Sequence, residues 1–219
     1  MLNSNRSRYL LKNTVIFAIG NFSTKLIAFF LVPFYTYVLT TEEYGVVNLI
    51  FTLATLIGPL LMLNLQDAVR RFALENNADH KAILTVEWII VIVGYIIGLI
   101  LIPLAKLYTP ISLYAVELYF YVTSLSANTI FLEYLRGIEK MKTYSFCSVL
   151  SSFVIAVLNI VFLTQLHLGV NGYFLSYVIA FTLSSIVAVI IGKVSERDSA
   201  VLPVERAVEI VSPGEVCTD

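Results

Sequence analysis

The chain has 219 residues, of which 58% are hydrophobic and only 13% are charged, and its mean hydropathy is +0.86. A soluble domain could not cover so much apolar surface with so few charges, so the composition indicates a membrane protein. The net charge of −1 and the lack of a basic patch interleaved with aromatic residues argue against nucleic acid as a partner.

Six segments are apolar over the roughly 20 residues that a helix needs to cross the hydrocarbon layer. We therefore predict an all-α, polytopic membrane protein with six transmembrane helices in one unit, residues 14–193. The predicted spans are 14–39, 44–65, 83–104, 113–132, 144–166 and 170–191. The first is too long for the apolar region of a cleaved signal peptide, so we expect it to be retained. Residues 1–13 precede the unit, and we expect the tail, residues 194–219, to be disordered or weakly helical.

Lysine and arginine residues are concentrated in four regions: the N-terminus and the segments after the second, fourth and sixth spans. These regions hold twelve of the 14 Lys and Arg residues, whereas the opposite loops hold only Lys106. Because positive residues in short loops stay on the cytoplasmic side, we predict that both termini are cytoplasmic.

Lys25 lies inside the first span, where a charge near the centre costs roughly 2.5–3.5 kcal/mol. Placed at 100° per residue, small and polar residues share its helix face, among them Thr14 and Asn21. We therefore predict that this face lines a polar cavity. A structural ion pair, or a lysine that extends toward the interface, is the alternative.

Polar side chains are also aligned on later spans. The second span carries Asn48 and Thr52 on one face, and the fourth carries Glu117 and Asn128 on one face. We expect these residues to line the same cavity as Lys25. For any single Ser, Thr or Asn the alternative is an interhelical hydrogen bond, and for Glu117 it is exposure at the interface.

Pro33 and Pro59 lie inside the first two spans. Each proline removes a backbone donor and clashes with the carbonyl four residues earlier, so it is expected to kink or loosen its helix. Such a kink is typical of a moving segment in a transporter and also of a static bend set by packing.

No enzyme or metal chemistry is indicated by the reactive residue types. Cys147 and Cys217 stand far apart without a Cys-x-x-Cys spacing, so neither a disulfide framework nor a thiolate metal site is predicted. No glycine-flanked serine is present for an intramembrane protease, and Asp67 and Asp79 are too isolated for a metal-dependent transferase. We therefore predict a protein that is not an enzyme and that needs no cofactor.

Several motifs occur in a characteristic order along residues 10–193. The first is the run from Leu10 to Ile50, which contains Lys25, Pro33 and the sequence EEYG. The next are AVRRFALE, which carries Arg71, LRGIEKMKTY, which carries Arg136, and LGVNGYFLSY. In these motifs and their spacing the chain resembles bacterial Wzx-type polysaccharide (O-antigen) flippases of the multidrug/oligosaccharidyl-lipid/polysaccharide exporter superfamily.

The resemblance implies a carrier in the bacterial inner membrane that moves undecaprenyl-diphosphate-linked sugar repeat units to the periplasmic leaflet. Such a carrier serves polysaccharide or lipopolysaccharide synthesis and works by alternating access between two helical lobes. Arg71 and Arg136 would belong to motifs on its cytoplasmic side. The implied partners are the lipid-linked oligosaccharide, the lipid bilayer, a polysaccharide polymerase and glycosyltransferases.

Members of this family carry about twelve to fourteen spans in two lobes, whereas six are predicted here. We therefore interpret the chain as the N-terminal lobe of a truncated protein, with a dimerising half-length carrier as the alternative. Two other functions stay open. One is a cation-coupled multidrug exporter, which would need a membrane-embedded carboxylate, and the other is an inactive fragment.

Overall fold

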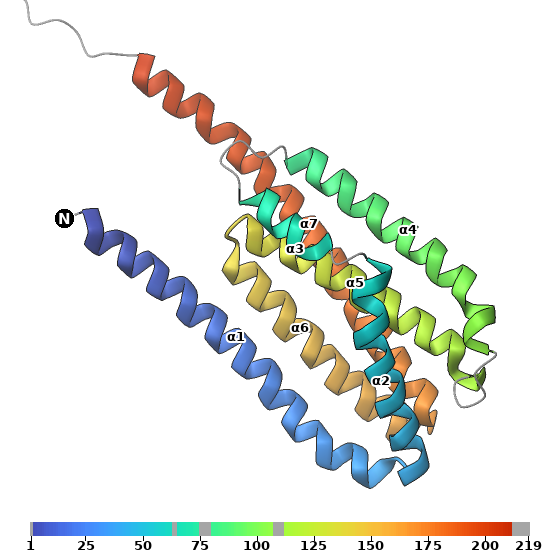
Figure 1. The fold of residues 1–219 in the computed structure, drawn as a ribbon. Helices are drawn as coiled ribbons and strands as arrows, with labels where there is room; N and C mark the ends of the chain where they lie inside the picture. The colour runs from blue at the N-terminus through green and yellow to red at the C-terminus, as the bar shows by residue number, and fades with distance from the viewer. Residues whose placement is uncertain (1, 63–64, 75–79, 107–111, 212–219) are drawn as a thin grey trace, which may run out of the picture.

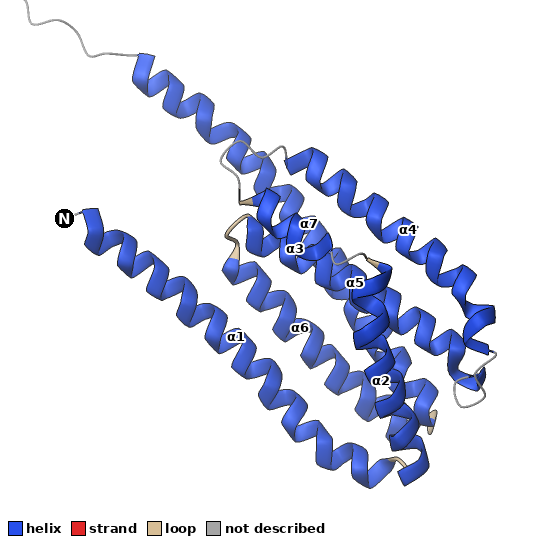
Figure 2. Ribbon diagram, in the orientation of Figure 1, coloured by secondary structure: helices blue, strands red, loops and turns tan. Residues whose placement is uncertain are grey.

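The computed structural model describes the backbone of residues 2–62, 65–74, 80–106 and 112–211, and the side chains there except at 2–10, 12–13, 80–82, 104–106 and 192–211. Within these ranges the chain is helical apart from short connections and contains no strand (Figure 2), so the predicted all-α class is confirmed. In chain order the elements are α1 (Leu2–Val38), α2 (Thr41–Leu61), α3 (Leu65–Ala73), α4 (His80–Lys106), the short η1 (Ser112–Tyr114), α5 (Ala115–Gly137), α6 (Met141–Ile160), the π-helical η2 (Val161–Gln165) and α7 (Gly169–Val211).

Helix α5 is the centre of the bundle, because α2, α3, α4, α6 and α7 all pack against it (Figure 1). Most of its residues are buried, including polar ones. Thr123 is fully buried, and its hydroxyl donates to the carbonyl oxygen of Tyr119 at 2.8 Å. Back-bonding of this kind satisfies a hydroxyl without water and without another helix.

The central position of α5 explains why the predicted count of six spans is approximate. Among the described residues, five helices are long and apolar enough to cross a membrane: 14–38, 41–61, 83–103, 141–165 and 169–191. Helix α5, predicted as the span 113–132, is long enough but more polar. Because other helices cover most of α5, its polar side chains do not face hydrocarbon. Its sequence can therefore be less hydrophobic than that of a lipid-facing helix.

Helices α1 and α2 meet at a tight connection and then diverge (Figure 1). Thr40 begins α2 with a capping box: its backbone N–H donates to Glu43 Oε2 at 2.9 Å, and the Glu43 N–H donates to Thr40 Oγ1 at 3.2 Å. Beyond the connection α1 packs along α6. Gly20 permits this contact, because a Cβ there would lie 2.8 Å from the Cβ of Ser145.

Two segments differ from the sequence prediction. The second span was expected over 44–65, but α2 ends at Leu61 and the short amphipathic α3 follows after a break. The tail, residues 194–219, was expected to be disordered or weakly helical. In the structure α7 continues as a helix to Val211, and the rest of the tail lies outside the described residues.

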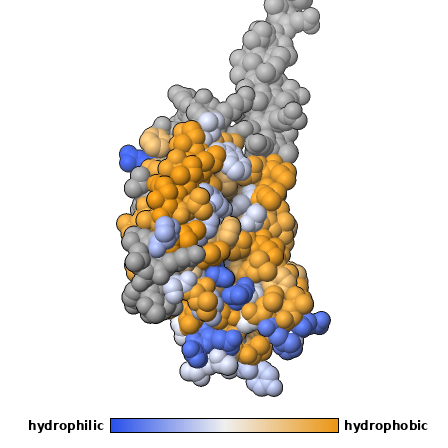
Figure 3. All heavy atoms as spheres, turned by 90° about the vertical axis from the view of Figure 1, so that its right-hand side faces the viewer, coloured by the Kyte–Doolittle hydropathy of each residue, from blue (hydrophilic) through white to orange (hydrophobic). Residues whose placement is uncertain are grey.

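The surface and the ends of the bundle fit a membrane setting. The side seen in Figure 3 is largely hydrophobic, with hydrophilic residues toward its lower edge. On α1, Phe29 and Phe30 are 68% and 67% exposed, and large exposed apolar surfaces of this kind are typical of contact with a membrane. The start of α1, α3, the α5–α6 connection and the C-terminal part of α7 lie toward one end (Figure 1), so the four cation-rich regions share that end.

Candidate functional site

A polar cavity of about 460 Å³ lies among α1, α2, α5, α6 and α7. It is bounded by the two helices that diverge from the Thr40 connection and by the three that form the centre of the bundle. Its lining combines one ammonium group, hydroxyl and amide groups and aromatic rings with aliphatic side chains such as Leu31 and Ile155. The residues that carry these groups are Thr24, Lys25, Tyr35, Tyr44, Asn48, Phe51, Thr55, Tyr121, Ser151, Ser152, Tyr173, Tyr177 and Phe181.

Lys25 is the cation of this cavity, and α1 holds it close to the midpoint of the span 14–38. No described carboxylate forms an ion pair with it, because the ion pairs in the described part of the chain involve only Asp67, Glu133 and two arginines. A structural ion pair therefore does not account for Lys25 within the described residues. Its charge is available to an anionic ligand.

Four tyrosines form one wall of the cavity, and Asn159, which does not line it, holds one of them by a hydrogen bond. The Tyr173 hydroxyl donates to the Tyr177 hydroxyl at 3.1 Å, and the two rings lie 4.9 Å apart on successive turns of α7. The Tyr35 ring meets Tyr173 edge to face at 5.0 Å, and its hydroxyl accepts from Asn159 Nδ2 at 3.0 Å. Tyr121 completes the wall, edge to face with Tyr177 at 5.6 Å. Such rings offer an apolar face and a polar edge to one ligand.

Asn48 is the predicted site residue that the structure brings together with Lys25. Its Nδ2 donates to the Tyr44 carbonyl at 3.0 Å, which leaves its side-chain oxygen as an acceptor. Thr14, Asn21 and Thr52 lie on the same two helices but do not line this cavity. The Thr52 hydroxyl donates to the carbonyl oxygen of Asn48 at 2.8 Å.

Glu117 and Asn128 lie on α5, away from this cavity. Asn128 is 4% exposed, and its Oδ1 has no hydrogen-bond partner among the described residues. The Glu117 Oε2 is likewise buried without a described partner. The predicted stripe on the fourth span therefore reaches the cavity through Tyr121, which lies between these two residues on that face.

Sequence reasoning missed the contribution of α7, which supplies Tyr173, Tyr177 and Phe181. These aromatic residues recur at intervals of four, which places them on one helix face. That spacing was visible in the sequence, but an aromatic stripe on an apolar helix is equally typical of packing. Only the position of α7 beside α1 and α5 identifies it as a cavity wall.

The arginines of the family-like motifs lie at the charged end, away from Lys25. Glu133 accepts from Arg136 at 2.6 Å and from Arg70 at 3.3 Å, and Arg70 also contacts Asp67 at 3.0 Å. The Arg136 guanidinium lies 5.2 Å from the ring centre of Phe17. Arg136 thus ties α1 to α5, whereas Arg71 is exposed and forms no described ion pair.

Pro33 and Pro59 are both exposed, and α1 and α2 continue through them as helices. The Thr36 hydroxyl donates to the carbonyl oxygen of Pro33 at 2.9 Å, so the turn after the proline is reinforced by a side chain. The role of either proline as a moving kink stays a prediction.

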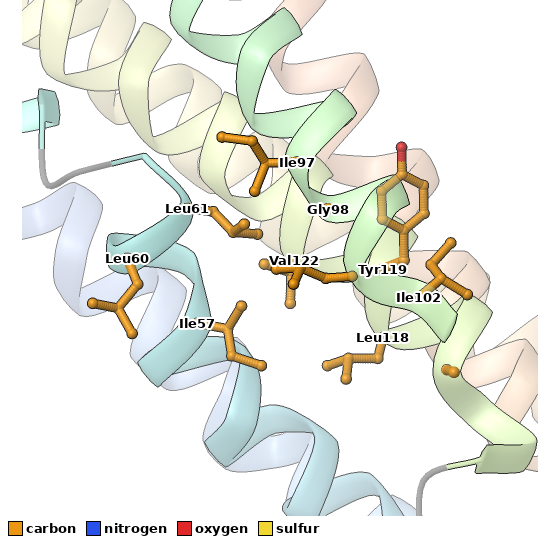
Figure 4. Close-up of a pocket in the computed structure, with 11 residues that line it drawn as sticks. Ile57, Leu60, Leu61, Ile97, Gly98, Ile102, Leu118, Tyr119 and Val122 are labelled. Atoms are coloured by element: carbon orange, nitrogen blue, oxygen red, sulfur yellow. The ribbon is translucent and has the colours of Figure 1, made fainter. Parts of the chain in front are cut away.

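A second hollow, of about 480 Å³, lies between α2, α4 and α5 and is apolar (Figure 4). Ile57, Leu60 and Leu61 approach it from α2, and Ile97 and Ile102 approach it from α4. The floor is formed by α5, where the only side-chain hydroxyl of the lining, on Tyr119, donates to the carbonyl oxygen of Tyr95 at 3.1 Å. We call this hollow the apolar groove.

Within the described residues no group of His, Cys, Asp or Glu side chains is arranged to hold a metal ion. A family model described as "Polysaccharide biosynthesis protein" matches residues 10–209, which is most of the chain. Comparison with curated proteins and with solved structures gives no match.

Proposed function

The chain belongs to the polysaccharide biosynthesis protein family, and from this premise we propose that it transports lipid-linked oligosaccharide across a membrane. In the form that the sequence motifs suggest, the cargo is an undecaprenyl-diphosphate-linked repeat unit, such as that of an O-antigen or lipopolysaccharide. The membrane is the bacterial inner membrane, and the cation-rich end faces the cytoplasm.

The observation that carries the proposal is the ammonium of Lys25 in a hydroxyl-lined cavity without a described carboxylate partner. A diphosphate headgroup is anionic and strongly hydrated, so it needs a wet, positive path through the hydrocarbon layer. A lysine offers a compact charge with three donors to phosphate oxygens.

The remaining lining suits the sugar. Sugar hydroxyls both donate and accept, and the cavity offers tyrosine and serine hydroxyls together with the Asn48 side-chain oxygen. The lipid tail needs no site of its own, since the outer face of α1 already presents exposed apolar residues such as Phe29 and Phe30 to hydrocarbon.

We further propose that the described bundle acts as one lobe and works with a second lobe or a second copy. Helices α1 and α2 contact each other only near their connection, so the cavity is bordered there by two diverging helices. A facing lobe would close that side and allow alternating access. Polymerase and glycosyltransferase partners remain part of the same proposal.

A cation-coupled multidrug exporter is less well supported. Such a carrier would place a carboxylate beside its cationic cargo, whereas no carboxylate is among the described residues that line the cavity. The one charged lining group, Lys25, repels a cationic drug.

The proposal is tested by ligand binding to the purified chain, because binding does not require the second lobe. Native mass spectrometry would compare a short-chain polyprenyl-diphosphate sugar with the same sugar on a neutral lipid. Lys25→Met should weaken binding of the diphosphate by about tenfold or more, since hydrogen bonds to charged groups contribute about 1.5–3 kcal/mol.

Two variants serve as controls. Lys25→Arg keeps the charge and should retain most of the affinity, and Lys142→Gln removes an exposed cation of α6 that does not line the cavity. Equal binding by the parent and Lys25→Met would refute the proposed role of Lys25. Equal binding of the diphosphate and the neutral lipid would refute the anionic cargo.

A further inference from the structure

Three contacts place the end of helix α3 at the level where two of the candidate spans begin. Gly137, at the end of α5, is so close to α3 that a Cβ there would lie 2.5 Å from the Ala73 Cβ. In the preceding residue, Arg136, the guanidinium stacks over Phe17 at 5.2 Å and Tyr144 at 5.4 Å. Phe17 and Tyr144 each lie three residues inside the first residue of their spans, 14–38 and 141–165. The end of α3 is therefore level with the point where these spans begin.

The two faces of α3 differ in what they present. Val69 and Ala73 are each 4% exposed and pack toward α5 and α4, with Leu84 and Tyr134 in the same cluster. Phe72 is 55% exposed, and Leu74, just after the helix, is also 55% exposed. An amphipathic segment with exposed aromatic and aliphatic residues at this level is typical of a helix lying in the interface.

Among the described residues near α3, one cation stands outside the ion pairs. Asp67, Arg70, Glu133 and Arg136 are joined by ion pairs of 2.6–3.3 Å, and their two carboxylates and two guanidiniums cancel. Arg71 is exposed and lies outside this network in the described part of the chain. It follows Arg70 by one residue, about 100° around the helix, and so points away from the ion pairs.

We propose that the outer face of α3 docks on an anionic lipid leaflet, with Arg71 on a headgroup phosphate and with Phe72 and Leu74 inserted beside it. Charge complementarity selects the occupant, because the excess cation stands next to apolar side chains at headgroup level. An Arg or Lys near an anionic bilayer surface gains about 1 kcal/mol of attraction, which corresponds to a roughly fivefold preference for anionic over zwitterionic lipid.

The experiment places a fluorophore on α3 in the reconstituted full chain. Phe72→Trp is made together with Trp88→Phe, which removes the only native tryptophan. Vesicles contain either dibrominated phosphatidylglycerol or dibrominated phosphatidylcholine at the same mole fraction, and bromine quenches a tryptophan that it contacts. We expect quenching by both lipids. The local concentration of phosphatidylglycerol at position 72 should be roughly fivefold higher than that of phosphatidylcholine, and this preference should fall with added salt.

Variants assign the preference to one side chain. Arg71→Gln should abolish the preference for phosphatidylglycerol, Arg71→Lys should keep most of it, and Lys142→Gln, an exposed cation on α6, should leave it unchanged. The proposal is overturned by absence of quenching, by equal quenching from the two lipids in the parent, or by a preference that survives Arg71→Gln. Displacement of phosphatidylglycerol by sodium pyrophosphate at constant ionic strength would also overturn it, because Arg71 would then serve a soluble phosphate.

Discussion

The polar cavity and the apolar groove are two hollows of nearly equal size, about 460 and 480 Å³, with opposite chemistry. Helix α2 borders both. It presents Asn48 and Thr55 to the cavity and, within the next two turns, Ile57 and Leu60 to the groove. Cavity volume therefore says little about function in this bundle.

The difference lies in what each hollow can solvate. Water needs two to four polar partners to occupy a cavity, and an apolar hollow stays dry. The cavity offers Lys25 and several hydroxyls, whereas the hydroxyl of Tyr119 in the groove is already bonded to the Tyr95 carbonyl. We conclude that the cavity can be wet and the groove cannot. Three measurements test this contrast.

The largest effect is expected in thiol accessibility. Lys25→Cys and Ile97→Cys are made in a background with Cys147→Ala and Cys217→Ser, and each protein is reconstituted. A membrane-impermeant methanethiosulfonate should modify position 25 roughly a hundredfold faster than position 97, because the thiolate forms in water and not in hydrocarbon. Complete inertness of position 25 from both sides of the bilayer would contradict the wet cavity.

A smaller effect is expected when a positive charge is introduced into the apolar groove. Ile97→Lys places an ammonium among apolar side chains, so the free energy of unfolding should fall by up to roughly 2.5–3.5 kcal/mol. Ile97→Met, which keeps a similar length without the charge, is the control. Unfolding in mixed micelles would measure both variants. Equal stability of the two would show that the groove admits water.

The smallest effect is expected from packing at the floor of the groove. A Cβ at Gly98 would lie 2.9 Å from Tyr119 Cε2, so Gly98→Ala should destabilise the protein by about 1–3 kcal/mol. Gly45→Ala on α2 meets no atom within 4 Å and should instead stabilise by about 0.5–1 kcal/mol through helix propensity. Opposite signs in thermal unfolding would confirm that α4 and α5 are closely packed there. A stabilising Gly98→Ala would contradict it.

Periodicity along single helices predicted part of the lining of the polar cavity. Lys25 and Asn48 were each placed on a polar face by the 3.6-residue repeat, and the structure brings these two faces to one cavity. Thr14 and Thr52 satisfied the same repeat but lie outside the lining. The repeat gives the direction in which a side chain points around the helix axis, but not its level along the axis. The cavity extends over only part of that length, where the neighbouring helices diverge.

The sequence alone was enough to predict an all-helical membrane protein, the positions of most of its helices, and a cation within the first span. These properties follow from hydropathy and from charge, which act residue by residue. The packing of the helices was needed to show that α5 is the protein-covered centre, that α7 supplies tyrosines to the cavity of α1, that Arg70 of α3 binds Glu133 of α5, and that Arg136 stacks on Phe17. Contacts between helices depend on which side chains interlock across distant segments, and no local pattern in the chain records that choice.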